Sequence, residues 1–267
     1  MIKLLLIILF SVVSTASALE LHGSEEQGGV LLGKTVPGAT VSLGDNQTTA
    51  GDDGTFVMGI PRLQPEKSTL SINLMGGIEE KYPLVIKQRD YKTQYIKGVA
   101  KKTVNPSDED MKQINADTAQ ILSARAVEDA LPYVWQQFEF PVKDTPITGV
   151  YGSRRFYNGE ERNWHKGVDF AAPTGTPVHA PADGIVRLAL PNSFFNGNLV
   201  IVDHGYQLMT IYAHLNDMSV KVGDKVSQGD ILGHIGTTGR STGPHLHWGL
   251  YWRNMALDPM LLVKKEK

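Results

Sequence analysis

Three short segments near the end of the chain contain residues that could bind a metal and move protons. His165 and Asp169 lie in the first segment, His214 in the second, and His245 and His247 in the third. Neutral imidazole and ionised carboxylate are zinc ligands, and a catalytic zinc site uses three protein ligands and leaves a fourth position for water. His165, Asp169 and one histidine of the 245/247 pair would supply such a set. Two histidines then remain for acid–base chemistry, so the segments predict metal-assisted hydrolysis.

The second and third segments have the alternation of β-strands. Residues two apart in a strand point to the same face, with Cα atoms about 6.6 Å apart. One of His245 and His247 can then bind the metal while the other faces the water. His214 ends a run in which Thr210, Tyr212 and His214 would share a face. A neighbouring strand would bring His214 to the same side of the sheet.

The first segment must bend if both of its candidate ligands bind one metal. In an ideal strand His165 and Asp169 would stand about 13 Å apart, which is too far for one zinc ion. Helical spacing would place them on one face, but Gly167 and Pro173 argue against a helix here. The sequence therefore predicts a kink or bulge at Lys166-Gly167, where glycine permits it.

The whole pattern of these segments resembles that of the lysostaphin-type zinc metallopeptidases, also called the LytM or peptidoglycan DD-metalloendopeptidase family. The shared pattern is His-x-x-x-Asp, a lone histidine in Tyr-x-His-Leu, and His-x-His. The connecting sequence is also similar: Tyr151-Gly-Ser-Arg-Arg155, Ala171-Ala-Pro-Thr-Gly-Thr-Pro177, Ala182-Asp-Gly184 and Gly243-Pro-His-Leu-His247. The resemblance covers about residues 140–260. It implies a β-rich domain of the barrel-sandwich-hybrid type, known as the duplicated hybrid motif.

The resemblance also implies a role for each residue. His165, Asp169 and His247 would bind Zn²⁺, and His214 and His245 would be the catalytic histidines. Zinc would polarise the scissile carbonyl and lower the pKa of its bound water toward about 7, which makes that water the nucleophile. One free histidine would accept the proton of the water, and the other would donate to the oxyanion or the leaving amine. The implied substrate is the peptide stems and cross-links of bacterial peptidoglycan.

Three further residues are candidates for substrate binding. Arg154 and Arg155 would form bidentate pairs with a substrate carboxylate, or else they are solvated loop charges. Tyr157 would stabilise an oxyanion, or else it packs structurally. The histidines outside the pattern are expected to have surface or packing roles: His22, His179, His204 and His234.

The elements that must position these residues are mainly β-strands, in three parts. Short β-rich runs separated by turn signals such as Pro37-Gly38 predict a small β-sandwich accessory domain over residues 19–103. Residues 104–139 predict a helical connector. Residues 140–267 predict a β-rich metallopeptidase domain that includes a hairpin of residues 198–202 and 207–214.

The connector has recognisable helix signals. Ser107 is the expected N-cap, and Asp110 completes a variant of the capping box. An approximate apolar stripe from Ile114 to Ala126 would form its packing face. Pro132 marks the expected end of the helix.

Composition and the first residues indicate an exported protein that does not bind nucleic acid. The net charge is −2, whereas nucleic-acid-binding proteins concentrate positive charge. An apolar run followed by Ala16-Ser17-Ala18 predicts a signal peptide over residues 1–18, and no segment is long and apolar enough to be a transmembrane span. The chain has no cysteine, so neither a disulfide framework nor a lipid-bearing cysteine is expected. These features favour a bacterial envelope, with the periplasm as the expected location and the extracellular space as the alternative.

Other functions stay open beside a zinc endopeptidase. Some relatives have lost metal ligands and serve as non-catalytic scaffolds or activators of other wall hydrolases, but all five positions here hold competent residues. Residues 223–233 resemble turns of biotinyl- and lipoyl-carrier domains, yet no suitable lysine occurs between Val226 and Trp252. The region before residue 140 would either inhibit the site or form a stable accessory domain. The bond cleaved is a glycine bridge or a diaminopimelate cross-link, and the periplasmic expectation favours the second.

Overall fold

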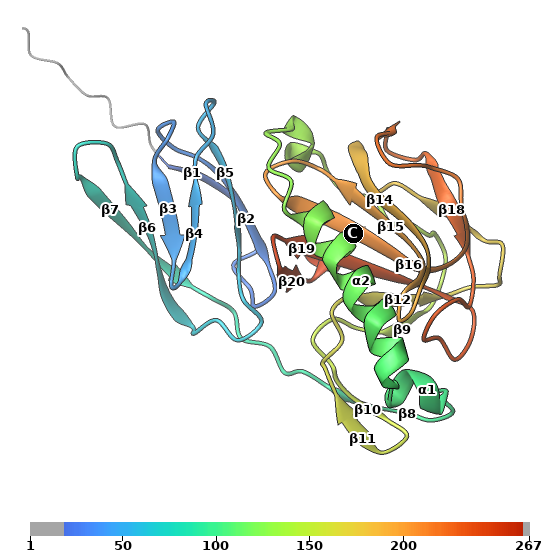
Figure 1. Cartoon of the computed structure of the whole chain (residues 1–267). Helices are drawn as coiled ribbons and strands as arrows, with labels where there is room; N and C mark the ends of the chain where they lie inside the picture. Colours follow the sequence, from blue (N-terminus) through green and yellow to red (C-terminus); the bar gives the residue numbers. More distant parts are fainter. Residues whose placement is uncertain (1–18, 264–267) are drawn as a thin grey trace, which may run out of the picture.

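The computed structural model describes residues 19–263, shown in Figure 1. This part of the chain is mainly β, in four sheets, which confirms the fold class expected from the sequence. No helix within it is long and apolar enough to cross a membrane. The expected signal peptide, residues 1–18, lies outside the described residues.

Two small antiparallel sheets in the N-terminal part share one hydrophobic core. Their strand orders are β1-β2-β5 and β4-β3-β6-β7. The strands are β1 (Glu20–Gly23), β2 (Val30–Lys34), β3 (Thr40–Leu43), β4 (Asn46–Thr49), β5 (Thr55–Gly59), β6 (Lys67–Asn73) and β7 (Glu79–Val85). Alternate side chains point inward, so Val41 and Leu43 lie opposite Ile72 and Leu70 and pack in the same core as Phe56. The two sheets form a small sandwich.

An 18-residue helix follows the sandwich. It is α2 (Asp108–Arg125), and the short helix α1 (Lys101–Val104) precedes it. Ser107 Oγ accepts from the Asp110 N–H, and the Asp110 carboxylate accepts from the Ser107 N–H, which confirms the capping box. The expected helix end near Pro132 is wrong. The helix ends at Arg125, and Pro132 begins the 3-10 helix η1 (Pro132–Trp135), a position that suits proline because its missing N–H is not needed there.

The packing face of α2 agrees only in part with the expected apolar stripe, of which Ile121 packs against the core cluster that contains Ala124. The buried residues of α2 are Asp117 and Ala124, while Leu122 is 41% exposed. The Asp117 carboxylate accepts a hydrogen bond from the Phe194 N–H at 2.7 Å. In Figure 1 the helix crosses the face of the large sheet, against β14 (Gly184–Ser193). The Asp117 hydrogen bond and the apolar contacts of Ile121 and Ala124 hold the helix there, and hydrophobic periodicity does not detect the first of these.

Residues 147–257 form a ten-stranded antiparallel sheet. Seven strands follow in the order β17-β14-β15-β16-β19-β12-β9, β13 pairs with β18, β18 pairs with β16, and β20 pairs with β19. The remaining bounds are β9 (Ile147–Gly149), β12 (Val168–Ala171), β13 (Pro177–His179), β15 (Gly197–Asp203), β16 (Leu208–Met218), β17 (Lys225–Val226), β18 (Ile231–Ile235), β19 (His245–Trp252), β20 (Met255–Leu257) and the 3-10 helix η2 (Pro259–Leu261). Strands β15 and β16 form the expected hairpin, with Asp203 opposite Met209.

A third small sheet joins residues that are distant in sequence. It has the order β11-β10-β8, with β8 (Thr93–Ile96) parallel to β10 (Arg154–Tyr157) and β11 (Glu160–Arg162) antiparallel to β10. Strand β8 thus pairs across the expected boundary between residues 103 and 104. The domain limits remain predictions, but residues 93–96 contribute structurally to the C-terminal half.

The sandwich packs against the large sheet through a shared apolar core. Trp252 of β19 and Leu257 of β20 lie in the same cluster as the sandwich residues. At this contact an Arg89 guanidinium nitrogen lies 2.8 Å from an Asp258 carboxylate oxygen, and the Asp258 N–H donates to the Gly28 carbonyl at 2.8 Å. Apolar burial and an ion pair therefore hold the two halves together.

Candidate metal centre and active site

The three expected metal ligands meet at one point of the large sheet. Strands β12 and β19 pair with Asp169 opposite His247, and His165 lies in the loop just before β12. His165 Nε2 is 3.0 Å from Asp169 Oδ1, and His247 Nδ1 is 2.9 Å from that same oxygen. One ligand atom from each residue lies within 4.8 Å of the others. The structure therefore brings these three side chains together.

The chain bends at Gly167, as predicted, and this bend places His165 beside Asp169. Close packing, and not a left-handed φ, explains why glycine stands there. A Cβ atom would lie 2.4 Å from the Trp248 carbonyl oxygen and 2.8 Å from the His247 ring. The bare backbone lets the first segment lie directly against the strand that carries the third ligand.

The ligand set has the chemistry that zinc requires. Two imidazole nitrogens and one carboxylate form a donor set typical of catalytic zinc sites. Their separations of 2.9–3.0 Å are close to the roughly 3.3 Å between donor atoms around a tetrahedral zinc ion. Burial lowers the pKa of His165 to about 4, so the ring is neutral near pH 7. Burial acts to raise the pKa of Asp169, but contacts with His165 and His247 outweigh it and hold that pKa well below its usual value.

The second oxygen of Asp169 is held from outside the cluster. Arg155 of β10 donates to Asp169 Oδ2 at 2.5 Å, and its Nε donates to Gln94 Oε1 of β8 at 3.1 Å. Gln94 also donates to the Thr148 carbonyl at 3.3 Å. These contacts fix the carboxylate so that Oδ1 faces the two histidines.

His214 and His245 lie beside the ligand cluster. Their ring centroids are 4.7 Å apart, and the His214 ring is 6.2 Å from that of His247. His214 Nδ1 donates to the Thr238 carbonyl at 2.8 Å, and His245 Nδ1 donates to the Gly243 carbonyl at 2.9 Å. Burial lowers the pKa of His214 to about 3, so this ring is neutral near pH 7. With Nδ1 as donor, the neutral ring of His214 presents Nε2 as a proton acceptor, and the Nδ1 contact of His245 likewise leaves its Nε2 directed away from the Gly243 carbonyl.

The ring of His214 reaches the site by a departure from regular strand geometry. Tyr212 pairs with Trp248 and both are buried in the core, whereas Ala213 pairs with His247. His214 has a left-handed φ of 65°, which interrupts the alternation and turns its ring to the side of His247. The expectation that His214 shares a face with Tyr212 is therefore wrong, because it assumed an unbroken strand.

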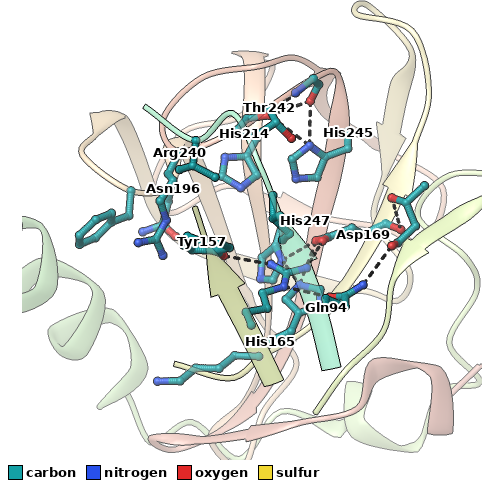
Figure 2. Close-up of a pocket in the computed structure, with 18 of the residues that line it drawn as sticks. Gln94, Tyr157, His165, Asp169, Asn196, His214, Arg240, Thr242, His245 and His247 are labelled. Atoms are coloured by element: carbon teal, nitrogen blue, oxygen red, sulfur yellow. Dashed lines mark hydrogen bonds and ion pairs between the residues drawn. The ribbon is translucent and has the colours of Figure 1, made fainter. Parts of the chain in front are cut away.

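The five residues line one pocket with a volume of about 520 Å³. Figure 2 shows the rings of His214 and His245 above His247, with Arg240 and Tyr157 to one side. Other lining side chains come from several separate segments: Gln94, Ile96, Val99, Phe195, Asn196 and Arg240. The pocket wall therefore includes residues that precede the C-terminal half in sequence.

Two of the three expected substrate residues line this pocket. Arg155 and Tyr157 do so, and the Tyr157 hydroxyl accepts from an Arg155 Nη at 3.4 Å. Arg154 is exposed, does not line the pocket, and pairs with Glu161 at 2.8 Å. Neighbours in a strand point to opposite faces, so the structure does not support a substrate role for Arg154. Arg155 already has a carboxylate partner in Asp169.

Sequence reasoning missed Gln94 and Arg240. Gln94 stands 61 residues before Arg155, and only the parallel pairing of β8 with β10 brings them together. Arg240 lies shortly before the Gly243-Pro-His-Leu-His247 motif, and this proximity is the one signal that could have marked it.

Comparisons with known proteins agree with this geometry. The sequence signature of Peptidase family M23 matches residues 163–259. The peptidoglycan DD-endopeptidase ShyA of Vibrio cholerae is 47% identical over 133 residues, which are 49% of this chain and 30% of that protein. The DD-carboxypeptidase/endopeptidase Mpg of Neisseria meningitidis is 38% identical over 120 residues, which are 45% of this chain and 27% of that protein. A Pseudomonas aeruginosa crystal structure assigned to peptidase M23 has a TM-score of 0.67 at 28% identity and covers 90% of this chain and 95% of that one.

The β fold and the histidine–carboxylate cluster together define a domain of the metallopeptidase class. Residues 163–259 of the chain form a peptidase family M23 domain, which confirms the resemblance found in its motifs. The chain spans only 30% and 27% of the length of the two curated relatives above.

Proposed function

We propose that this chain is a zinc endopeptidase that hydrolyses peptide cross-links of bacterial peptidoglycan. The observation that carries the proposal is the convergence of His165, Asp169 and His247, with the rings of His214 and His245 beside them. The names of the relatives ShyA and Mpg support the substrate class.

The site has a residue for each proton transfer of peptide hydrolysis. His165, Asp169 and His247 would hold the ion, which when bound supplies a Lewis acid and a more acidic water. The Nε2 of one free histidine accepts a proton from the water as its oxygen attacks the scissile carbonyl. The other, once protonated, donates to the oxyanion or to the leaving nitrogen as the C–N bond breaks. The Thr238 and Gly243 carbonyls hold both rings in orientation.

Paired histidine variants test the proposal on purified, cross-linked wall peptides. His247→Ala should lose both zinc and cleavage, because it removes a ligand. His245→Ala should keep zinc but cleave about 10²–10⁴-fold more slowly, because it removes a proton-transfer group. Metal analysis and fragment mass spectrometry measure the two effects. Normal cleavage after complete, verified zinc removal would contradict the proposal.

Export to the bacterial envelope is part of the same proposal, with the periplasm preferred to the extracellular space. Residues 1–18, with their apolar run and small-residue end, support it. Fusing these residues to a reporter enzyme that is active only outside the cytoplasm should give activity. A fusion that stays inactive and uncleaved inside the cell would count against export.

A non-catalytic scaffold or activator of other wall hydrolases is the alternative. The five convergent side chains favour an enzyme, because a scaffold has no chemical need for them. Protein purified under zinc-replete conditions that binds no zinc, yet stimulates another wall hydrolase, would favour the alternative.

Control of the site by the N-terminal part is also a proposal. Among the described residues, none of those lining the pocket comes from the sandwich strands β1–β7, whereas Gln94, Ile96 and Val99 line it. The ligand cluster found within residues 19–263 contains no group from before residue 140. These contacts support a proposal in which any inhibition acts through the wall made by residues 94–99.

A further inference from the structure

Arg240 places a positive charge on the pocket wall without an acidic partner. Its guanidinium carbon lies 4.9 Å from the ring centroid of Tyr157 and 4.4 Å from that of Phe195. Its Nη1 donates to the Thr103 carbonyl at 3.3 Å. Within residues 19–263 it forms no ion pair, whereas Arg155, on the same wall, does. The wall thus orients the guanidinium and leaves its charge unneutralised.

The surroundings of Arg240 favour an incoming anion. Burial lowers the pKa of Arg240, and the nearby guanidinium groups of Arg155 and Arg162 act in the same direction. An arginine stays protonated nonetheless. Arg155 and Arg162 have the carboxylates of Asp169 and Glu160 as partners. A partly buried charge without a counter-ion is stabilised when a negatively charged group binds it.

Arg240 is also close to the reacting part of the pocket. Its N–H donates to the Phe195 carbonyl at 2.9 Å, and the next residue, Asn196, accepts from the His214 N–H at 2.7 Å. Its guanidinium also lies over the ring of Tyr157, whose hydroxyl accepts from Arg155, the partner of the Asp169 carboxylate. Figure 2 shows Arg240 beside His214 and Tyr157. A group bound to Arg240 therefore lies in the pocket that His214 and His245 also line.

We infer that Arg240 binds a carboxylate of the substrate and thereby selects diaminopimelate-type cross-links. This inference rests on the proposed function. In such a cross-link the carbon that bears the scissile nitrogen also bears a carboxylate, whereas a glycine bridge has no charged group at that position. A planar guanidinium matches a carboxylate with two parallel hydrogen bonds, and the rings of Tyr157 and Phe195 hold that plane in place.

Two cross-linked peptides that differ in one group test this assignment. One has the free carboxylate beside the scissile bond, and the other has a carboxamide there. The zinc-loaded wild-type chain should cleave the carboxylate peptide with a kcat/KM about tenfold or more higher, because a buried charge would otherwise be left unpaired. Arg240→Gln should lose this preference, mainly through a raised KM, while it keeps its zinc. Arg240→Lys should keep part of it, because the charge remains but the planar fork is lost.

The matched control is Arg154→Gln, which removes a charge of the same kind outside the pocket. It should leave the preference unchanged. Binding is then measured without cleavage in the zinc-loaded His245→Ala variant. There the carboxylate peptide should bind about tenfold more tightly than the carboxamide peptide. Adding Arg240→Gln to this variant should abolish the difference.

The outcomes separate this inference from the proposed function. If the wild-type chain cleaves neither peptide but the binding preference is present and depends on Arg240, the proposed function fails and the carboxylate site stands. If the two peptides are cleaved and bound equally, the assignment is overturned. A preference that survives Arg240→Gln, or that disappears in Arg154→Gln, overturns it as well.

Discussion

Asp169 divides its two carboxylate oxygens between different partners. Oδ1 faces His165 and His247, and Oδ2 accepts from Arg155. Arg155 is itself held by Gln94, which belongs to a different strand. At the scale of single residues, the orientation of a proposed metal ligand thus depends on two side chains outside the ligand cluster.

Replacing Arg155 with glutamine should weaken zinc binding by about 10–100-fold, since outer partners of metal ligands have effects of this size. Competition with a chelator of known affinity measures the dissociation constant. Gln94→Ala should change it in the same direction by less, and Arg154→Gln should not change it. An unchanged constant in Arg155→Gln would mean that strand β12 alone orients the carboxylate.

His204 lies away from the metal cluster and ties stability to pH. It is fully buried, its Nδ1 donates to the Asp183 carbonyl at 2.7 Å, and its Nε2 is 2.8 Å from the Thr210 hydroxyl. Burial lowers its pKa from 6.5 to about 4. Because the folded-state pKa is the lower one, the unfolded chain takes up the proton first as the pH falls below 6.5. The contribution of His204 to the free energy of unfolding should therefore fall by roughly 3 kcal/mol between pH 7 and pH 4.

Urea unfolding of the zinc-free chain at a series of pH values measures this dependence. His204→Asn should be less stable at pH 7 but should lose less stability on acidification than the wild-type chain. His165 and His214 have lowered pKa values as well, so acidification lowers the free energy of unfolding of both proteins by the same amount through these two residues. Two parallel curves would exclude His204 as a cause.

At the scale of elements, the site depends on two local departures from regular strands. The chain bends at Gly167 before β12, and His214 has a left-handed φ within β16. The spacing of His165 and Asp169 predicted the first, because a straight strand would keep them about 13 Å apart. No spacing predicted the second, because a single left-handed residue leaves the preceding alternation unchanged. The residues of the site could thus be found from sequence, but the left-handed backbone conformation that turns the His214 ring toward the site could not.

Gly167→Ala should disrupt the first of these departures. The added Cβ would lie 2.4 Å from the Trp248 carbonyl oxygen, which cannot move without shifting strand β19. We expect a loss of roughly 1–3 kcal/mol in the free energy of unfolding, together with weaker zinc binding. Gly243→Ala is the matched control, because a Cβ there meets nothing within 4 Å. Thermal unfolding and zinc titration compare the two variants. Equal stability and zinc affinity in both would show that the backbone around Gly167 shifts to accommodate a Cβ atom at little cost.

Helix α2 marks another limit of local patterns. Its capping box was predictable, because Ser107 and Asp110 interact within one turn. Its packing face was predictable only in part, because Ile121 packs as expected but Asp117 is buried through a hydrogen bond to Phe194, a residue far away in the sequence. Contacts within a turn can be derived from the order of residues, whereas a long-range polar contact needs the fold.

At the scale of the whole molecule, the sandwich and the large sheet share one core. Turn signals and alternation predicted β structure on both sides of the helix. They did not predict that Trp252 and Leu257 would pack against the sandwich, since the same side chains would suit a core within the C-terminal half alone. The parallel pairing of β8 with β10 was equally hidden, because it joins strands separated by the whole helical region.

A chain that begins at residue 140 should therefore be less stable and less active than one that begins at residue 19. It would expose Trp252 and Leu257 to water, and it would lack Gln94 and the pocket wall around it. Thermal unfolding, zinc affinity and peptide cleavage, measured on both chains, check this expectation. A shortened chain that folds stably and cleaves faster would instead favour inhibition by the N-terminal part.

The family signature begins at residue 163, whereas Gln94, Arg155 and Tyr157 all lie before it. Part of what orients the proposed metal ligands and lines the pocket is thus encoded upstream of the segment by which the family is recognised. Two chains with identical signature residues can therefore differ in metal affinity and in the substrates that their pockets accept. Changes in this upstream wall offer evolution, and protein engineers, a way to retune the hydrolase while every motif histidine stays in place.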